Sequence, residues 1–168
     1  SGIRSNGNGT LTIKGGKIEQ ATGGDSEKYG GSGIYSSSKL TISDSATIGN
    51  AQGGKGKGKS GGSGIYSYGD LTISGGKIQK ATGGASTNGS GGSGIYSSTL
   101  TISGNATIGN AQGGDGNASG GSGILGNTME ILAGTIQKAI GGNASNGTGG
   151  SGIRSNGNGT LTIKGGKI

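Results

Sequence analysis

A short unit repeats along the whole chain. The tripeptide Ser-Gly-Ile begins at Ser1, Ser32, Ser63, Ser93, Ser122 and Ser151. In most copies a Leu-Thr-Ile segment, a short turn, a further Ile, an Ala and two Gly-Gly pairs around a variable loop follow. Self-similarity at a period of roughly 30 residues is the signature of repeat architectures, so we expect a stack of like coils.

A larger period lies on top of the first. Residues 1–18 and 151–168 share the sequence SGIRSNGNGTLTIKGGKI. The turn before the last Ile of each copy also alternates, as in Gly15-Gly16-Lys17 and the longer Ser43–Thr47 segment. The larger unit therefore contains five coils, and the chain is expected to be an internal segment of a longer array. The coils are residues 1–31, 32–62, 63–92, 93–121 and 122–150, with residues 151–168 as a partial copy of the first.

The apolar residues of the copies align in columns. One such column is Ile13, Ile42, Ile73, Ile102, Ile131 and Ile163. Leu-Thr-Ile alternates apolar and polar residues, which is typical of a strand, and no segment has helical spacing. We therefore predict an all-β parallel β-helix (β-solenoid) without helices, continuous over residues 1–168. Each coil is expected to hold three short strands, near Ile34, Leu40–Ile42 and Ile48–Ala51 in the second coil. The Gly-Gly pairs and Asn-Gly steps are interpreted as turns around flexible surface loops.

Composition excludes several classes of protein. The chain has 47 Gly but no Pro, Cys or His, so collagen, disulfide frameworks and usual zinc sites are ruled out. Its seven carboxylates are scattered, and nucleophilic catalysis lacks the usual His base. We predict no catalytic, cofactor-binding or metal-binding residue, and no enzyme. No apolar run reaches the ~18 residues of a membrane helix, so no membrane insertion is expected. Lys55, Lys57 and Lys59 form the only dense basic run, and we expect no nucleic-acid binding.

The string GGSGIYSYGDLTISGGKIQKATGG, from Gly61 to Gly84, resembles glycine-rich right-handed parallel β-helix repeats of bacterial surface and secreted proteins. The likeness extends over the whole chain. This resemblance implies right-handed coils and an adhesin-like or carbohydrate-binding role for some members. It is specific for the fold, whereas function must be argued from sites.

An outward stripe is predicted at the position after the first Ile of each coil. It consists of Arg4, Tyr35, Tyr66, Tyr96, Leu125 and Arg154. Tyr ladders contact sugars or partners, and Arg4 is placed to form a cation–π pair with Tyr35. The alternative interpretation is cross-strand stacking that stabilises the sheet.

Two further surface features are candidates for function. An outward Thr column suits ice binding, but Lys39 and Asp70 interrupt its companion column. The column is Thr12, Thr41, Thr72, Thr101, Glu130 and Thr162. Asn-x-Ser/Thr motifs are candidate glycosylation sites in a secreted chain. They lie at Asn8, Asn88, Asn105, Asn117, Asn143, Asn146 and Asn158.

The leading hypothesis is a non-catalytic structural filament or stalk, extracellular or at the cell surface. Its coils stack end to end, so its main partner is itself, and open strand edges favour addition of more chain. The alternative is a carbohydrate-binding or adhesin module that holds glycans with the Tyr stripe. Ice binding is a remote alternative. The sequence leaves open whether the coils continue through one long chain or through stacked subunits.

Overall fold

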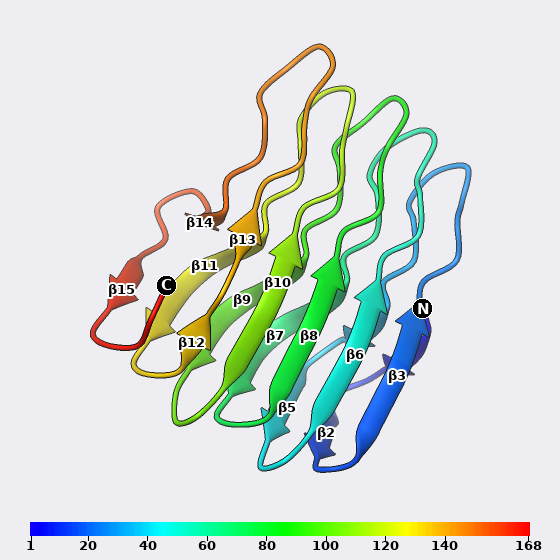
Figure 1. Ribbon diagram of the computed structural model, residues 1–168. Helices are drawn as coiled ribbons and strands as arrows, with labels where there is room; N and C mark the ends of the chain where they lie inside the picture. The colour runs from blue at the N-terminus through cyan, green and yellow to red at the C-terminus, as the bar shows by residue number, and fades with distance from the viewer.

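The computed structural model describes all 168 residues, and it contains 15 β-strands and no helix. Like residues of successive coils are direct partners of parallel strands, as in Ile42, Ile73 and Ile102. The coils stand side by side along one axis, with strands below and loops projecting as arms at the top (Figure 1). The predicted β-solenoid, with coils roughly 30 residues apart, is thus confirmed.

The strands form two sheets that enclose the core. A nine-stranded sheet contains β1 (Ile3–Ser5), β2 (Thr10–Lys14), β4 (Ile34–Ser36), β5 (Lys39–Ser43), β7 (Ile65–Ile73), β9 (Ile95–Ile102), β11 (Ile124–Ile131), β14 (Ile153–Ser155) and β15 (Leu161–Ile163). A six-stranded sheet contains β3 (Lys17–Thr22), β6 (Thr47–Gln52), β8 (Lys77–Thr82), β10 (Thr107–Gln112), β12 (Thr135–Ile136) and β13 (Ala139–Ile140). No helix is present that could cross a membrane.

The expectation of two short strands before the turn and one after it holds in the first two coils and is wrong for the third to fifth. There the first two strands merge into β7, β9 and β11. A single strand of the second sheet follows β7 and β9, whereas β12 and β13 follow β11. Five residues separate Ser5 from Leu11 in the first coil, whereas two separate Ser97 from Leu100 in the fourth. In the fourth and fifth coils, a connection of only two residues leaves no room for a turn. In the third coil the surplus residue is absorbed as an irregularity in register between Ser67 and Asp70.

The core is built from columns of branched side chains between the two sheets. It holds 22 buried hydrophobic residues, among them Ile42, Ile73 and Ile102 with no exposed surface. Burying an Ile or Leu side chain stabilises the fold by about 1.5–3 kcal/mol. Because neighbouring coils present the same residue at the same height, each side chain packs against a copy of itself.

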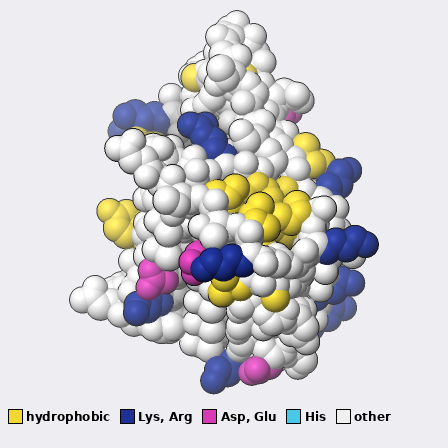
Figure 2. Space-filling view, turned by 90° about the vertical axis from the view of Figure 1, so that its left-hand side faces the viewer, with side chains coloured by type: hydrophobic (Ala, Val, Ile, Leu, Met, Phe, Trp, Pro, Cys, Tyr) yellow, Lys and Arg dark blue, Asp and Glu magenta, His cyan; other side chains and the backbone are white.

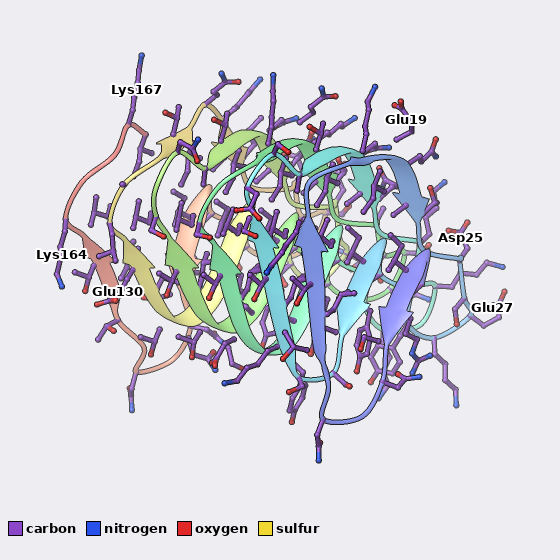
Figure 3. All side chains as sticks on the ribbon, turned by 90° about the horizontal axis from the view of Figure 1, so that it is seen from below. Glu19, Asp25, Glu27, Glu130, Lys164 and Lys167 are labelled. Atoms are coloured by element: carbon purple, nitrogen blue, oxygen red, sulfur yellow. The ribbon has the colours of Figure 1, made fainter.

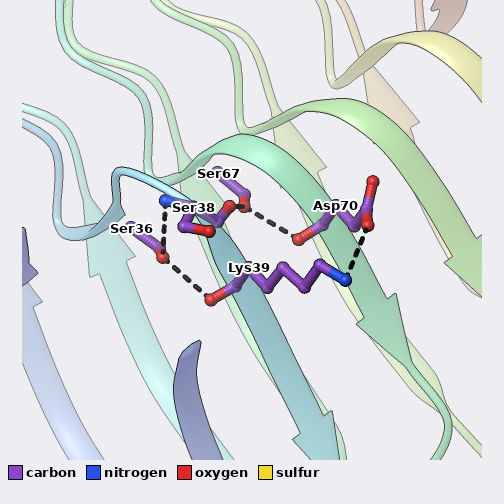
Figure 4. Close-up of polar contacts among 5 residues, drawn as sticks. All are labelled: Ser36, Ser38, Lys39, Ser67 and Asp70. Carbon is purple, nitrogen blue, oxygen red and sulfur yellow. Dashed lines mark hydrogen bonds and ion pairs between the residues drawn. The ribbon is translucent and has the colours of Figure 1, made fainter. Parts of the chain in front are cut away.

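In the second and third coils a buried serine hydrogen-bonds to the backbone three residues further along the chain. The Ser36 hydroxyl donates to the Lys39 carbonyl, and the Ser67 hydroxyl to the Asp70 carbonyl, both at 2.9 Å (Figure 4). Both serines are fully buried. Each carbonyl thus supplies a hydrogen-bond partner for a hydroxyl that is buried in the core, as a buried polar group requires.

The Gly-Gly pairs do not form turns, contrary to the sequence-based interpretation. In each arm two glycine segments lie backbone against backbone, and a zigzag of hydrogen bonds links one coil to the next. For example, the Gly84 amide donates to the Gly62 carbonyl at 2.7 Å, and the Gly92 amide to the Gly84 carbonyl at 2.9 Å. A Cβ on Gly84 would lie 1.9 Å from the Gly54 carbonyl oxygen. Glycine is required here because the chains approach too closely for any side chain.

The alternating turns explain the second period. Four residues separate Ile13 from Ile18, whereas five separate Ile42 from Ile48. In the longer turn Ala46 is fully buried, and its carbonyl accepts a 2.7 Å hydrogen bond from the Lys77 amide of the next coil. A four-residue turn of one coil therefore packs against a five-residue turn of the next coil.

The arm geometry predicts that Gly84→Ala destabilises the fold by at least about 2 kcal/mol, because overpacked sites strain the backbone. Gly9→Ala is the control, since a Cβ at Gly9 meets no atom within 4 Å. Urea unfolding measures both changes. Equal midpoints for the two variants would contradict the packed-arm structure.

Candidate functional site

The outward Tyr stripe forms a stacked ladder on the nine-stranded sheet. The rings of Tyr35 and Tyr66 lie 5.4 Å apart at 12°, and those of Tyr66 and Tyr96 lie 4.7 Å apart at 21°. The Arg4 guanidinium carbon lies 5.2 Å from the Tyr35 ring centre. The predicted stacking and the Arg4–Tyr35 cation–π contact are both confirmed.

Stacking governs what the ladder can bind. The three rings are half-buried, and each covers a face of its neighbour, so the ladder presents mainly ring edges and hydroxyls. Burial, together with the flanking Tyr96 and Tyr35, raises the pKa of Tyr66 to about 12. Tyr68, two residues along β7, is 66% exposed and keeps its ring accessible. Leu125 and Arg154 continue the same register beyond Tyr96.

A polar groove of about 430 Å³ runs along the axis where the six-stranded sheet meets the arms. It is lined by hydroxyl and amide side chains in alternation and by glycines of the first Gly-Gly pair of coils one to four. These side chains are Thr22, Gln52, Thr82 and Gln112. Sequence reasoning missed this groove. The available signal was the polar residue that directly precedes the first Gly-Gly pair in coils one to four.

Carboxylates at the groove rim cap the amides of the next coil. The Asp25 carboxylate accepts from the Lys55 amide, and the Asp115 carboxylate from the Asn143 amide, both at 2.7 Å. Lys55 and Ala85 occupy the same position in the coils between, and they have no such acceptor. Accordingly, the amides of Ala85 and Asp115 donate to no protein acceptor. The groove thus offers hydrogen-bond donors to an oxygen-rich ligand.

The basic run Lys55, Lys57 and Lys59 lies on the arm of the second coil, and two of its lysines contact side chains of the first coil. Lys57 and Glu27 form a 2.7 Å ion pair, and this contact with Glu27 raises the pKa of Lys57. The Lys59 ammonium lies 5.6 Å from the Tyr29 ring centre. The chain contains no group of three or more His, Cys, Asp or Glu residues placed to hold a metal ion.

The candidate glycosylation residues lie mostly at the surface. Asn117 is half-buried and accepts a 3.1 Å hydrogen bond from the Asn146 side chain, which joins two neighbouring arms. The exposed ones are Asn8, Asn88, Asn105, Asn143, Asn146 and Asn158. Six of the seven side chains are therefore accessible for modification.

The predicted Thr column forms in register on the nine-stranded sheet, with Thr41 paired to Thr72 and Thr72 to Thr101. Charges interrupt the face beside it, where Lys39 and Asp70 form an ion pair at 3.7 Å. Glu130 breaks the column itself in the fifth coil. The flat Thr surface is thus short.

The two ends of the solenoid expose the core. Ile163 is 54% exposed and Ile168 59% exposed, whereas Ile102 and Ile108 are fully buried. Figure 2 looks onto the C-terminal end, where hydrophobic side chains gather at the centre and charges lie around the rim. An apolar centre within a polar rim is typical of a surface that another protein layer covers.

Comparison with known proteins gives no match to any family model, to any curated protein or to any solved structure. The function must therefore be argued from the geometry of the chain itself.

The ladder geometry predicts that one phenol of the folded protein ionises near pH 12, later than ordinary tyrosines at about 10. The Tyr66→Phe variant is expected to lose this late phase in an ultraviolet pH titration, whereas Tyr29→Phe retains it. Because the folded-state pKa is raised, the stability that Tyr66 contributes is present below about pH 10. It is lost as pH rises towards 12. A late phase that survives Tyr66→Phe would contradict the assignment.

Proposed function

We propose that this protein is a non-catalytic structural filament or stalk, built from β-solenoid units stacked end to end. The observation that carries the proposal is the seating of the duplicated segment. Residues 151–168, which repeat residues 1–18, pair with the fifth coil in the register used inside the unit. The end of one unit is thus a template for the start of the next.

The junction reproduces the interior contacts at the level of individual residues. Ile153 pairs with Ile124, and Ile163 with Ile131, in the columns that the earlier coils form. The Gly123 amide donates to the Ser151 carbonyl at 2.9 Å, as the Gly94 amide does to the Ser122 carbonyl at 3.0 Å. The strand register and these apolar columns therefore continue across the junction.

Energetics favour a long stack over a short one. Ile and Leu side chains of the second to fourth coils are 0–1% exposed, whereas Ile3, Leu11 and Ile13 on the first coil are only half-buried. Each added coil covers one apolar end and creates another, so the exposed area stays constant as the buried area grows. A filament therefore has less exposed apolar surface per residue than an isolated unit.

An extracellular or cell-surface location is part of the proposal. It is supported by the absence of Cys, by the surface candidates for glycosylation and by the resemblance to surface β-helix repeats. Such an element has itself as its main partner and needs no cofactor.

A carbohydrate-binding or adhesin role is the second candidate. It is supported by the exposed ring of Tyr68 beside the Tyr ladder and by the polar groove beneath the arms. Sugars stack on accessible ring faces, so we expect Tyr68→Ala to weaken any glycan binding more than Tyr66→Ala. A glycan array with both variants tests this, and the absence of binding by the parent chain would end this candidate.

The filament proposal predicts rods of defined length. A protein with two tandem copies of residues 1–150, followed by residues 151–168, should be longer than the present chain by about 24 Å, which is five strand spacings. Electron microscopy or small-angle X-ray scattering measures the increment. Two compact bodies joined at variable angles would contradict a continuous stack.

A further inference from the structure

We propose that the outer face of the six-stranded sheet binds a linear acidic polysaccharide along the solenoid axis, with a carboxylate-bearing sugar over every second coil. The inference rests on the carbohydrate-binding candidate, names its ligand class and places the ligand on the sheet opposite the Tyr ladder. It does not depend on the stacking of units into a filament.

The outward lysines of this face recur on every second coil of the five-coil unit. Lys80 in β8 lies between Asn50 of β6 and Asn110 of β10. Lys77, near the start of the same strand, lies between two threonines. Because two strand spacings are about 9.6 Å, positive charge recurs at that interval along the axis. The lysines of the first, third and fifth coils on this face are Lys17, Lys77, Lys80 and Lys138.

Most of these lysines have no carboxylate partner. Glu19 is the only acidic side chain on the strands of this sheet, and it pairs with Lys17 at 2.7 Å. In Figure 3 Lys167 and Glu19 lie near opposite ends of this face, and nitrogen-tipped side chains project outward between them. The exposed lysines of this face that belong to no ion pair are Lys77, Lys80, Lys138 and Lys167.

Three cations of the nine-stranded sheet, by contrast, have partners. Lys39 lies 3.7 Å from Asp70, and Lys164 lies 3.6 Å from Glu130. Arg4 lies over the first ring of the Tyr ladder. The six-stranded sheet therefore carries the larger free positive charge, and charge complementarity favours a polyanion on this sheet.

The coils without lysine form shallow steps between the coils with lysine. Strands β6 and β10 both read Thr-Ile-Gly-Asn-Ala-Gln, so their outward Thr, Gly and Asn residues are short. The outward residues of β8 include Lys77 and Lys80, which are longer. A Cβ at Gly49 would lie 2.5 Å from the Glu19 carbonyl oxygen, so a side chain cannot fill the step over β6. Each step leaves room for an uncharged sugar ring.

The spacing of the lysines selects the kind of polysaccharide. Two sugar units of an extended chain are about as long as two strand spacings, roughly 9.6 Å. A chain with a carboxylate on every second sugar therefore places its charges over the coils that carry lysine. A Lys ammonium group binds such a carboxylate through up to three hydrogen-bond donors. Gln52 and Gln112, where this sheet meets the polar groove, supply amides for the sugar hydroxyls.

The same face suits a polar polymer better than a lipid surface or bases. None of the exposed large hydrophobic side chains lies on a strand of this sheet. Binding at a lipid surface uses apolar side chains in addition to cations, and single-stranded nucleic acids stack their bases on aromatic rings. The strands of the six-stranded sheet contain no aromatic residue.

Two triple variants with the same loss of net charge test the surface. The sheet variant carries Lys77→Gln, Lys80→Gln and Lys138→Gln, and the arm variant carries Lys55→Gln, Lys57→Gln and Lys59→Gln. The probe is a fluorescent hyaluronan oligosaccharide of about six sugars, which has a carboxylate on every second sugar and can span five coils. Fluorescence anisotropy measures its affinity, and circular-dichroism melting checks that both variants keep the fold.

We expect the sheet variant to weaken binding by at least about tenfold and the arm variant by less than about twofold. Lys→Arg at the three sheet positions should retain binding, and 1 M salt should abolish it because salt screens exposed charges. Equal losses in the two Gln variants, or no binding by the parent chain, would overturn the proposal.

Three comparison ligands test the class of partner. A galacturonate oligomer of equal length carries a carboxylate on every sugar, and we expect it to bind no more tightly than the hyaluronan probe. Neutral dextran should not bind. Dextran binding equal to that of hyaluronan, or galacturonate binding about tenfold tighter, would overturn the match to the lysine spacing. Tighter binding of duplex DNA or of anionic lipid vesicles would overturn the choice of a polysaccharide.

This inference and the candidate on which it rests fail separately. Hyaluronan binding that Tyr68→Ala removes and the sheet variant retains would overturn the six-stranded face. Carbohydrate binding would then stand on the nine-stranded sheet. The length of the tandem protein, which tests the filament, does not depend on either result.

Discussion

In this protein each side chain must pack against the side chain at the equivalent position of the next coil, one strand spacing away. Parallel hydrogen bonds between coils impose this constraint, because they hold like residues at roughly 4.8 Å along the axis. Branched apolar residues satisfy it by packing into columns, and Tyr35, Tyr66 and Tyr96 satisfy it by stacking their rings. Like charges satisfy it poorly. Accordingly, Lys17 and Lys77 each pair with Thr47 in the coil between them, so the two lysines are not direct neighbours.

The same constraint explains how a chain with so few large apolar residues can form an ordered structure. Ile and Leu are a small share of the sequence, and they fill only a narrow core between the two sheets. Outside this core, the arms are ordered by backbone packing, with hydrogen bonds such as that from Gly84 to Gly62 repeated from coil to coil. Side-chain contacts between arms, such as the Lys57–Glu27 ion pair, add to it. Removing the Cβ lets two backbones approach closely. Glycine, usually a source of flexibility, is here the condition for close packing.

The proposed filament follows from the way the duplicated segment pairs with the fifth coil. Residues 151–168 cover strand β11 of the fifth coil in the register of the interior. The same pairing would let one five-coil unit continue into the next. Glu130 and the short turn of the fifth coil distinguish the junction from the interior interfaces, so the unit boundary carries its own register information.

The sequence by itself determined the features that depend on period and polarity: the coil length, the five-coil unit, the Ile columns, the outward Tyr ladder and the Arg4–Tyr35 contact. These were predictable because parallel stacking turns a sequence period directly into contact between like residues. Only the tertiary structure decided the merging of strands in the third to fifth coils, the packed glycine arms and the groove lined by Gln52 and Thr82. Glycine has no side chain to signal an inside or an outside, so a packed glycine segment and a loose loop look alike in sequence. They differ only in the distance between two backbones, which the fold sets.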